Sequence, residues 1–208
     1  MIDALERAVM ADPENLRLAA DYRQLALASG QFDRAIDFLE KVAGKKGSGP
    51  NIRISVALAR VDKVPVAGEF RRLYLGRDAV GSLTKSIEAR PSVLAYYVRG
   101  LINLYYNNFI FHRVPKGIED LQKALTLVTR DTPLILAWHV HMSLGDGYWR
   151  NLQPDKAREV WKNGLMQYPD TSELVRRVTG DNDVVERIVH DAVDPDTRVD
   201  TTLRGWVP

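Results

Sequence analysis

The chain has 208 residues, of which 45% are hydrophobic and 27% are charged, a balance typical of a soluble globular protein. Its net charge of +2 provides no strong electrostatic attraction for nucleic acid, so nucleic acid is not an expected partner. The absence of cysteine excludes disulfides, thiol catalysis and thiolate metal sites. No apolar run reaches the length of a transmembrane helix, so no membrane span is predicted.

Helices are predicted at the N-terminal end of the chain over 1–11 and, as a pair, over 16–43. Apolar residues recur at helical spacing on both sides of a turn that is marked by Gly30. Asn15 precedes the first helix of this pair and is a residue type that caps helices. The segment 16–43 therefore indicates a helix-turn-helix unit.

The next helix pair is predicted over 51–90, and its first part is ambiguous. In NIRISVALAR the aliphatic residues alternate at period two, as they do in a strand. The ALA triplet, and the lack of a second alternating segment that could pair with a strand, favour a helix over 51–64. We take this segment as helical and keep the strand as the alternative.

Two further helix pairs are predicted over 92–128 and 133–168. The stretch NNFIFHRVP, residues 107–115, lengthens the turn inside the first of these pairs. A last helix over 183–192 carries its valines and isoleucine on one face and acids opposite, which suits a C-terminal capping helix. Residues 193–208 indicate an extended C-terminal tail.

The strongest motif runs from His141 to Pro169, with the sequence HMSLGDGYWRNLQPDKAREVWKNGLMQYP. A Leu-Gly pair and a tyrosine mark its first half, and Ala157, Trp161 and Gly164 mark its second half. This order and spacing resemble one tetratricopeptide repeat (TPR) without insertion or deletion. A TPR is a helix-turn-helix that buries its apolar face only by stacking on neighbouring repeats, so the resemblance implies an array.

The resemblance covers about 16–169, but the array it implies is irregular. Ala35, Ala79 and Gly117 take the small position of Ala157 in the other pairs, and they lie farther apart than the roughly 34 residues of a regular repeat.

The fold implied by the resemblance is all-α. We expect a right-handed superhelical solenoid of about four TPR-like helix hairpins over 1–192, with capping helices at 1–11 and 183–192. The helix over 1–11 also resembles the second helix of a repeat, so the alternative is that the array begins before this sequence.

The function implied by the resemblance is that of a noncatalytic scaffold or adaptor. TPR arrays bind a protein or peptide partner in a concave groove that their first helices line. The groove residues expected from this register are Tyr97, Tyr105, His139, Met142, Asp146 and Trp149, with residues 107–115 at the rim. An alternative of a different class is a soluble TPR-type component of a bacterial TRAP-like transport system that handles a small ligand.

No catalytic residue, cofactor or metal site is predicted. The sequence has no nucleophile elbow, phosphate-binding glycine loop or His-Glu zinc motif. His139 and His141 are two residues apart on one helix, so they point to different sides and cannot hold one ion together. The expected partner is a protein or peptide of unknown identity, and a homo-oligomer remains open. The expected location is cytoplasmic, or periplasmic if a signal segment precedes this sequence.

Overall fold

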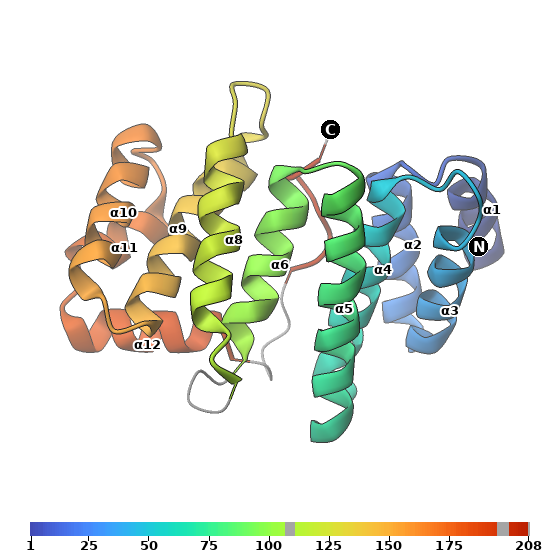
Figure 1. Ribbon diagram of the computed structural model, residues 1–208, viewed down its shortest axis with the longest axis horizontal. Coiled ribbons are helices and arrows are strands. Elements are labelled where there is room, and N and C mark those ends of the chain that lie inside the picture. Colours follow the sequence, from blue (N-terminus) through green and yellow to red (C-terminus); the bar gives the residue numbers. More distant parts are fainter. Residues whose placement is uncertain (107–110, 195–199, 208) are drawn as a thin grey trace. The chain divides into compact units, whose positions relative to one another are not determined.

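All regular structure is helical over the residues that the structure describes. The structure is a computed structural model that describes residues 1–106, 111–194 and 200–207 (Figure 1). Within these ranges no strand occurs, which confirms the prediction of an all-α fold built from paired helices. The chain forms two compact units, which we call the N-terminal unit (Met1–Pro91 with Arg198–Pro208) and the C-terminal unit (Ser92–Thr197).

The N-terminal unit is built from helices that pack largely in the order of the sequence. They are α1 (Ile2–Ala11), α2 (Leu16–Ala28), α3 (Phe32–Ala43), α4 (Pro50–Lys63), the 3-10 turn η1 (Val64–Val66) and α5 (Glu69–Ala89). Asn15 caps α2 as expected, because its side chain accepts a hydrogen bond from the Leu18 amide at 3.1 Å. Helix α1 packs on α2, and its Val9 has no exposed surface. Helix α1 thus extends the core of this unit.

Helix α4 resolves the ambiguous segment 51–64, and the prediction of a helix there is confirmed. This helix packs against α2, α3 and α5, so most of its circumference must be apolar. Ile52, Ile54 and Leu58 are therefore all buried, with at most 3% of their surface exposed. The period-two alternation reflects burial on several sides of a helix rather than the two faces of a strand.

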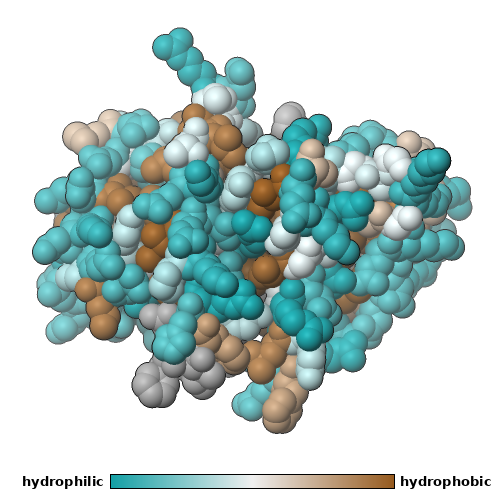
Figure 2. Space-filling model, viewed as in Figure 1, coloured by the Kyte–Doolittle hydropathy of each residue, from teal (hydrophilic) through white to brown (hydrophobic). Residues whose placement is uncertain are grey.

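The surface of the molecule is mostly hydrophilic on the face that Figure 2 shows. An exception is the segment from the end of η1 to the first turns of α5, where Phe70 is 82% exposed and Val66 and Tyr74 are each 58% exposed. Exposed apolar side chains that gather in one place are a feature of contact surfaces.

The C-terminal unit continues the same construction. Its described helices are α6 (Val93–Tyr105), α8 (Val114–Leu127), α9 (Leu134–Arg150), α10 (Pro154–Gln167), α11 (Ser172–Thr179) and α12 (Asn182–Ala192). Helix α6 packs on α8 and α9 packs on α10, while α11 lies against α10 and α12 contacts α9 and α11. Helix α11 was not predicted from the sequence.

Helices α6 and α8 approach each other closely at two glycines. A Cβ atom at Gly100 would lie 2.8 Å from Cγ of Leu121, and a Cβ atom at Gly117 would lie 2.9 Å from the Gly100 carbonyl oxygen. Both distances are shorter than van der Waals contact, so neither position accepts a side chain without moving the helices apart. The small residue expected at Gly117 therefore marks a true helix–helix contact.

His141 is a buried histidine in the core of the C-terminal unit. It is 4% exposed, and its ring lies edge-on to Tyr168 with 5.8 Å between the ring centroids. Its Nδ1 atom has no hydrogen-bond partner among the described residues. Burial lowers the pKa of His141, because the charged imidazolium would lose its hydration in this core.

Acid is expected to destabilise the C-terminal unit through His141. Its pKa is lowered in the folded chain from the ordinary value of 6.5, so the unfolded chain binds the proton first as the pH falls. Stability should therefore decrease below about pH 6.5, by at most about 1.4 kcal/mol per pH unit for this one group. Thermal denaturation at pH 7.5 and 5.5 measures the effect. His141→Phe keeps a ring but removes the titration, so its melting temperature should fall less; equal losses in the two proteins would assign the effect to other groups.

Candidate partner-binding surfaces

Two of the predicted groove residues meet where α6 lies beside α9. The rings of Tyr97 and His139 are arranged edge to face, with 6.4 Å between their centroids. Tyr97 is 2% exposed and its burial raises the pKa of its hydroxyl, whereas His139 is half-buried. Nδ1 of His139 lies 2.7 Å from the Ile135 carbonyl oxygen, so Nδ1 is the nitrogen that donates. His139 also stacks on Trp138 at 3.7 Å, which forms an aromatic surface on the first turns of α9.

Tyr105 does not join this pair. It lies about 12 Å farther along α6 than Tyr97, at 1.5 Å per helical residue. Burial, together with the negative charge of Asp194, raises the pKa of Tyr105 to about 12. Tyr105 is therefore at the other end of α6, near the segment that follows α12. Residues 107–110 of the predicted rim lie outside the described residues.

Asp146 has an internal partner. Its two carboxylate oxygens accept hydrogen bonds from Nε and Nη2 of Arg177, on α11, at 2.7 and 2.9 Å. Both side chains are almost fully buried, and Arg177 also donates to Glu173 at 3.2 Å. This paired arrangement leaves Asp146 joining α9 to α11 rather than facing a groove.

Trp149 and Met142 also pack inward. Trp149 lies 5.8 Å from Trp161 between ring centroids, and its indole nitrogen donates to Glu186 of α12 at 2.6 Å. Met142 packs against the same cluster of buried residues. Helices α11 and α12 therefore cover the second half of α9.

Arg158 of α10 holds the end of α11. Its guanidinium donates to the carbonyl oxygens of Arg177 and Val178 at 3.4 Å and of Gly180 at 3.2 Å. It also donates to the side chain of Asn182 at 2.9 Å. These carbonyls belong to the last turn of a helix or follow it, where they have no partner within the helix.

The six predicted residues thus separate into two groups. Tyr97 and His139 are in contact, with Tyr105 farther along α6, while Met142, Asp146 and Trp149 have partners inside the unit. All three of the latter lie on α9, and α11, which was not predicted, packs against their side of that helix.

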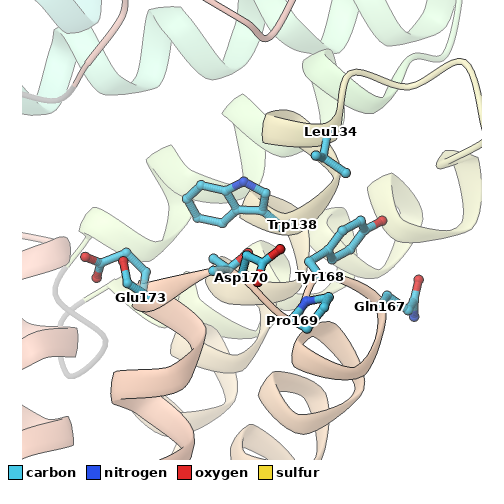
Figure 3. Close-up of a pocket in the computed structure, with 9 residues that line it drawn as sticks. Leu134, Trp138, Gln167, Tyr168, Pro169, Asp170 and Glu173 are labelled. Carbon is cyan, nitrogen blue, oxygen red and sulfur yellow. The ribbon is translucent and has the colours of Figure 1, made fainter.

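A pocket of about 370 Å³ lies next to this aromatic surface (Figure 3). Leu134 and Trp138 line it from α9, and the link between α10 and α11 lines it with Tyr168, Asp170 and other residues up to Glu173. Figure 3 shows Trp138 and Asp170 at the pocket and Gln167 pointing away from it. Sequence reasoning missed this pocket, although Trp138 stands next to His139, which it had selected.

The N-terminal unit has a polar cluster that sequence reasoning also missed. Arg23 of α2 donates to Asp62 of α4 at 2.7 Å and to the Thr201 carbonyl oxygen at 2.7 Å. The Thr201 hydroxyl donates to the other oxygen of Asp62 and accepts from Gln24 at 3.3 Å. Residues 200–207, part of the predicted tail, therefore pack on this unit.

The described residues include no group of three or more His, Asp or Glu side chains placed to hold a metal ion. None of the described helices is both long and apolar enough to cross a membrane.

Part of the sequence and the fold of this chain are similar to those of known proteins. A tetratricopeptide-repeat family model matches residues 2–60. No curated protein matches the chain in sequence. The thermophilic TPR protein TTC0263 of Thermus thermophilus has a TM-score of 0.62 and 19% identity, over 86% of this chain and 87% of that chain. A crystal structure of MamA has a TM-score of 0.55 and 19% identity, over 81% of this chain and 86% of that chain. The MamA RS-1 ArsTM double mutant has a TM-score of 0.56 and 16% identity, over 89% of this chain and 97% of that chain.

The match to the tetratricopeptide-repeat model covers residues 2–60, and the fold is similar to that of a TPR protein.

The TPR register explains the packing of the strongest motif. Trp161, on the second helix of its pair, is fully buried against Gly145 on the first helix. Its indole nitrogen donates to the Met142 carbonyl oxygen at 3.0 Å. The first helices of the TPR pairs are α2, α4, α6 and α9, so Arg23, Asp62, Tyr97 and His139 all project from first helices.

Proposed function

We propose that this protein is a noncatalytic TPR scaffold that binds a protein or peptide partner. We further propose that the first turns of α9 form one contact surface for that partner. The TPR fold supports a role in protein interaction, because stacked helix pairs offer extended surfaces and no reacting centre. This proposal keeps Tyr97 and His139 from the predicted set and adds Trp138.

The observation that carries the proposal is the exposure of large apolar side chains around the pocket. Leu134 is 66% exposed and Ile135 is 38% exposed, and they adjoin the stacked pair of Trp138 and His139. Tyr97 packs edge to face against the ring of His139. Aromatic residues held in place by packing provide large contact area at little entropic cost, which is why they dominate interface energies.

The rim of the pocket indicates the chemistry of the partner. Asp170 is exposed beside Tyr168, while Leu134 and Trp138 form the apolar wall. An apolar side chain can enter the pocket, and a lysine or arginine next to it on the partner would meet the carboxylate of Asp170. We therefore propose a partner segment that combines an apolar anchor with a neighbouring basic residue.

Affinity capture from native lysate, followed by calorimetry with the captured partner, tests the proposal. Trp138→Ala and His139→Ala should each weaken binding by about 2 kcal/mol, or roughly thirtyfold, provided that circular dichroism shows the fold intact. Met166→Ala is the matched control, because Met166 is 75% exposed on α10 and does not line the pocket.

Two results would contradict this function. Variants that fold and bind like the parent would remove the α9 surface from consideration. Capture of no protein, together with a rise in melting temperature caused by a small molecule that needs Trp138, would favour the small-ligand transport component instead. The pocket volume is within the range of small-molecule sites, so this second outcome is measurable.

A further inference from the structure

The C-terminal residues 200–207, which we call the strap, lie on the first helices of the N-terminal unit. Thr201 and Leu203 are 4% and 3% exposed, whereas Thr202 is half-buried and Arg204 is exposed. Burial at alternate positions shows that this segment presents one side to a surface. Thr201 and Leu203 are thus the two buried residues of the strap.

The contacts of Thr201 are those of a bound peptide rather than of a helix-packing residue. Its carbonyl oxygen accepts from Arg23 at 2.7 Å, and its hydroxyl bonds to Asp62 and Gln24. Arg23 thus binds the backbone of the strap, and Asp62 binds a side-chain hydroxyl of the strap. The 2.7 Å ion pair between Arg23 and Asp62 fixes both groups in place, so the site has the same geometry for any segment that offers a carbonyl and a hydroxyl.

Leu203, the second buried residue of the strap, has an unusual backbone conformation. Leu203 has a φ of 58°, which is disfavoured for a residue with a side chain, yet its side chain is buried. The Trp206 amide donates to the Leu203 carbonyl oxygen at 3.1 Å, which closes a turn at this point. The surrounding structure must hold this conformation in place.

The strap does not satisfy the site completely. Arg23 is 1% exposed, and its Nε atom has no hydrogen-bond partner among the described residues. A buried donor without an acceptor is unfavourable, so a ligand that supplies one more acceptor has an advantage over the strap. Together with the disfavoured backbone at Leu203, this makes the strap a ligand that can be displaced.

We propose that the strap is an intramolecular ligand that closes a peptide-binding groove on α2 and α4. When the strap leaves, this groove takes a peptide segment with a threonine or serine and, two residues later, a large aliphatic residue. The strap is tethered, so its effective concentration at the groove is on the order of millimolar, and a free peptide at micromolar concentration does not compete with it. This site belongs to the N-terminal unit, and the proposal does not rest on the α9 surface.

Binding of a labelled peptide to the full chain tests the proposal. The probe is an acetylated, amidated and fluorescein-labelled peptide, DTTLRGWV, with the sequence of residues 200–207. The release variant is Thr201→Val with Leu203→Glu, which removes the hydroxyl and places a charge in the buried seat. The matched control is Thr202→Val with Arg204→Glu, which makes similar changes at the alternate positions.

Fluorescence anisotropy should show that the release variant binds the peptide at least tenfold more tightly than the parent chain does. The matched control should behave like the parent. A probe peptide with Thr201→Val should bind the release variant at least tenfold more weakly than the original peptide, because it cannot donate to Asp62. A release variant that folds and binds no better than the parent overturns the proposal, and so does equal binding of the two peptides.

Hydrogen exchange on the unchanged chain provides a second test, which requires no variant to fold. Unlabelled peptide at millimolar concentration should accelerate exchange of the strap amides at residues 201–207, because it displaces the strap. Unchanged exchange overturns the proposal. Loss of the helical circular dichroism signal in the release variant also overturns it, since the strap would then be an integral part of the core.

Discussion

Arg177→Ala should destabilise the C-terminal unit by about 3–5 kcal/mol. Arg177 is 2% exposed and makes two hydrogen bonds to Asp146, which is 3% exposed. Removing the guanidinium leaves a carboxylate in the core without its counter-charge, and that uncompensated charge is the main cost. Urea denaturation of the parent and the variant measures the difference in the free energy of unfolding.

Two further variants separate this explanation from a general effect of truncation. Replacing both partners, with Asp146→Leu and Arg177→Met, removes the unpaired charge and should recover much of the lost stability. Arg176→Ala, at an exposed neighbour whose closest approach to Glu173 is 3.7 Å, should change stability by less than about 0.5 kcal/mol. If the double variant is as unstable as Arg177→Ala, the cost comes from lost packing and not from buried charge.

Trp161→Ala should cost about 3–5 kcal/mol in the free energy of unfolding. The Trp161 side chain is fully buried between Gly145 and Trp149, and it makes one hydrogen bond to the backbone of α9. Alanine leaves a cavity, because the Trp161 ring itself fills the space over Gly145 and the helices would have to shift to close it.

Thermal or urea denaturation measures this loss, with Lys162→Ala as a control at an exposed position on the same helix. The control should stay within about 0.5 kcal/mol of the parent. A Trp161→Ala protein as stable as the parent would mean that the contact between α9 and α10 does not depend on this ring.

The helix pairs could be predicted because their determinants are local and periodic. The Asn15 cap and the small residues at Gly117 and Ala157 depend on spacing within one or two helices, which a single sequence displays. Segment 51–64 was harder, because α4 is buried on several sides and its apolar residues no longer mark one face.

The roles of individual groove residues could not be predicted because their partners are distant and polar. Helix α11 has only eight residues, SELVRRVT, which is shorter than the window over which a helical period can be recognised in a sequence. Without α11, nothing in the sequence pairs Asp146 with Arg177. The bonds from Arg23 to Asp62 and to Thr201 join residues 39 and 178 positions apart, and no periodicity carries such information.

The anchoring of α11 also has a consequence for the order in which the chain acquires its structure. A helix of this length is not stable in isolation. Both groups that fix it, Asp146 and Arg158, lie earlier in the chain, on α9 and α10. We therefore expect α11 to become ordered only after that pair has formed. Because a ribosome releases the chain in this same direction, α9 and α10 are synthesised before α11 and can offer it a packing surface as it emerges.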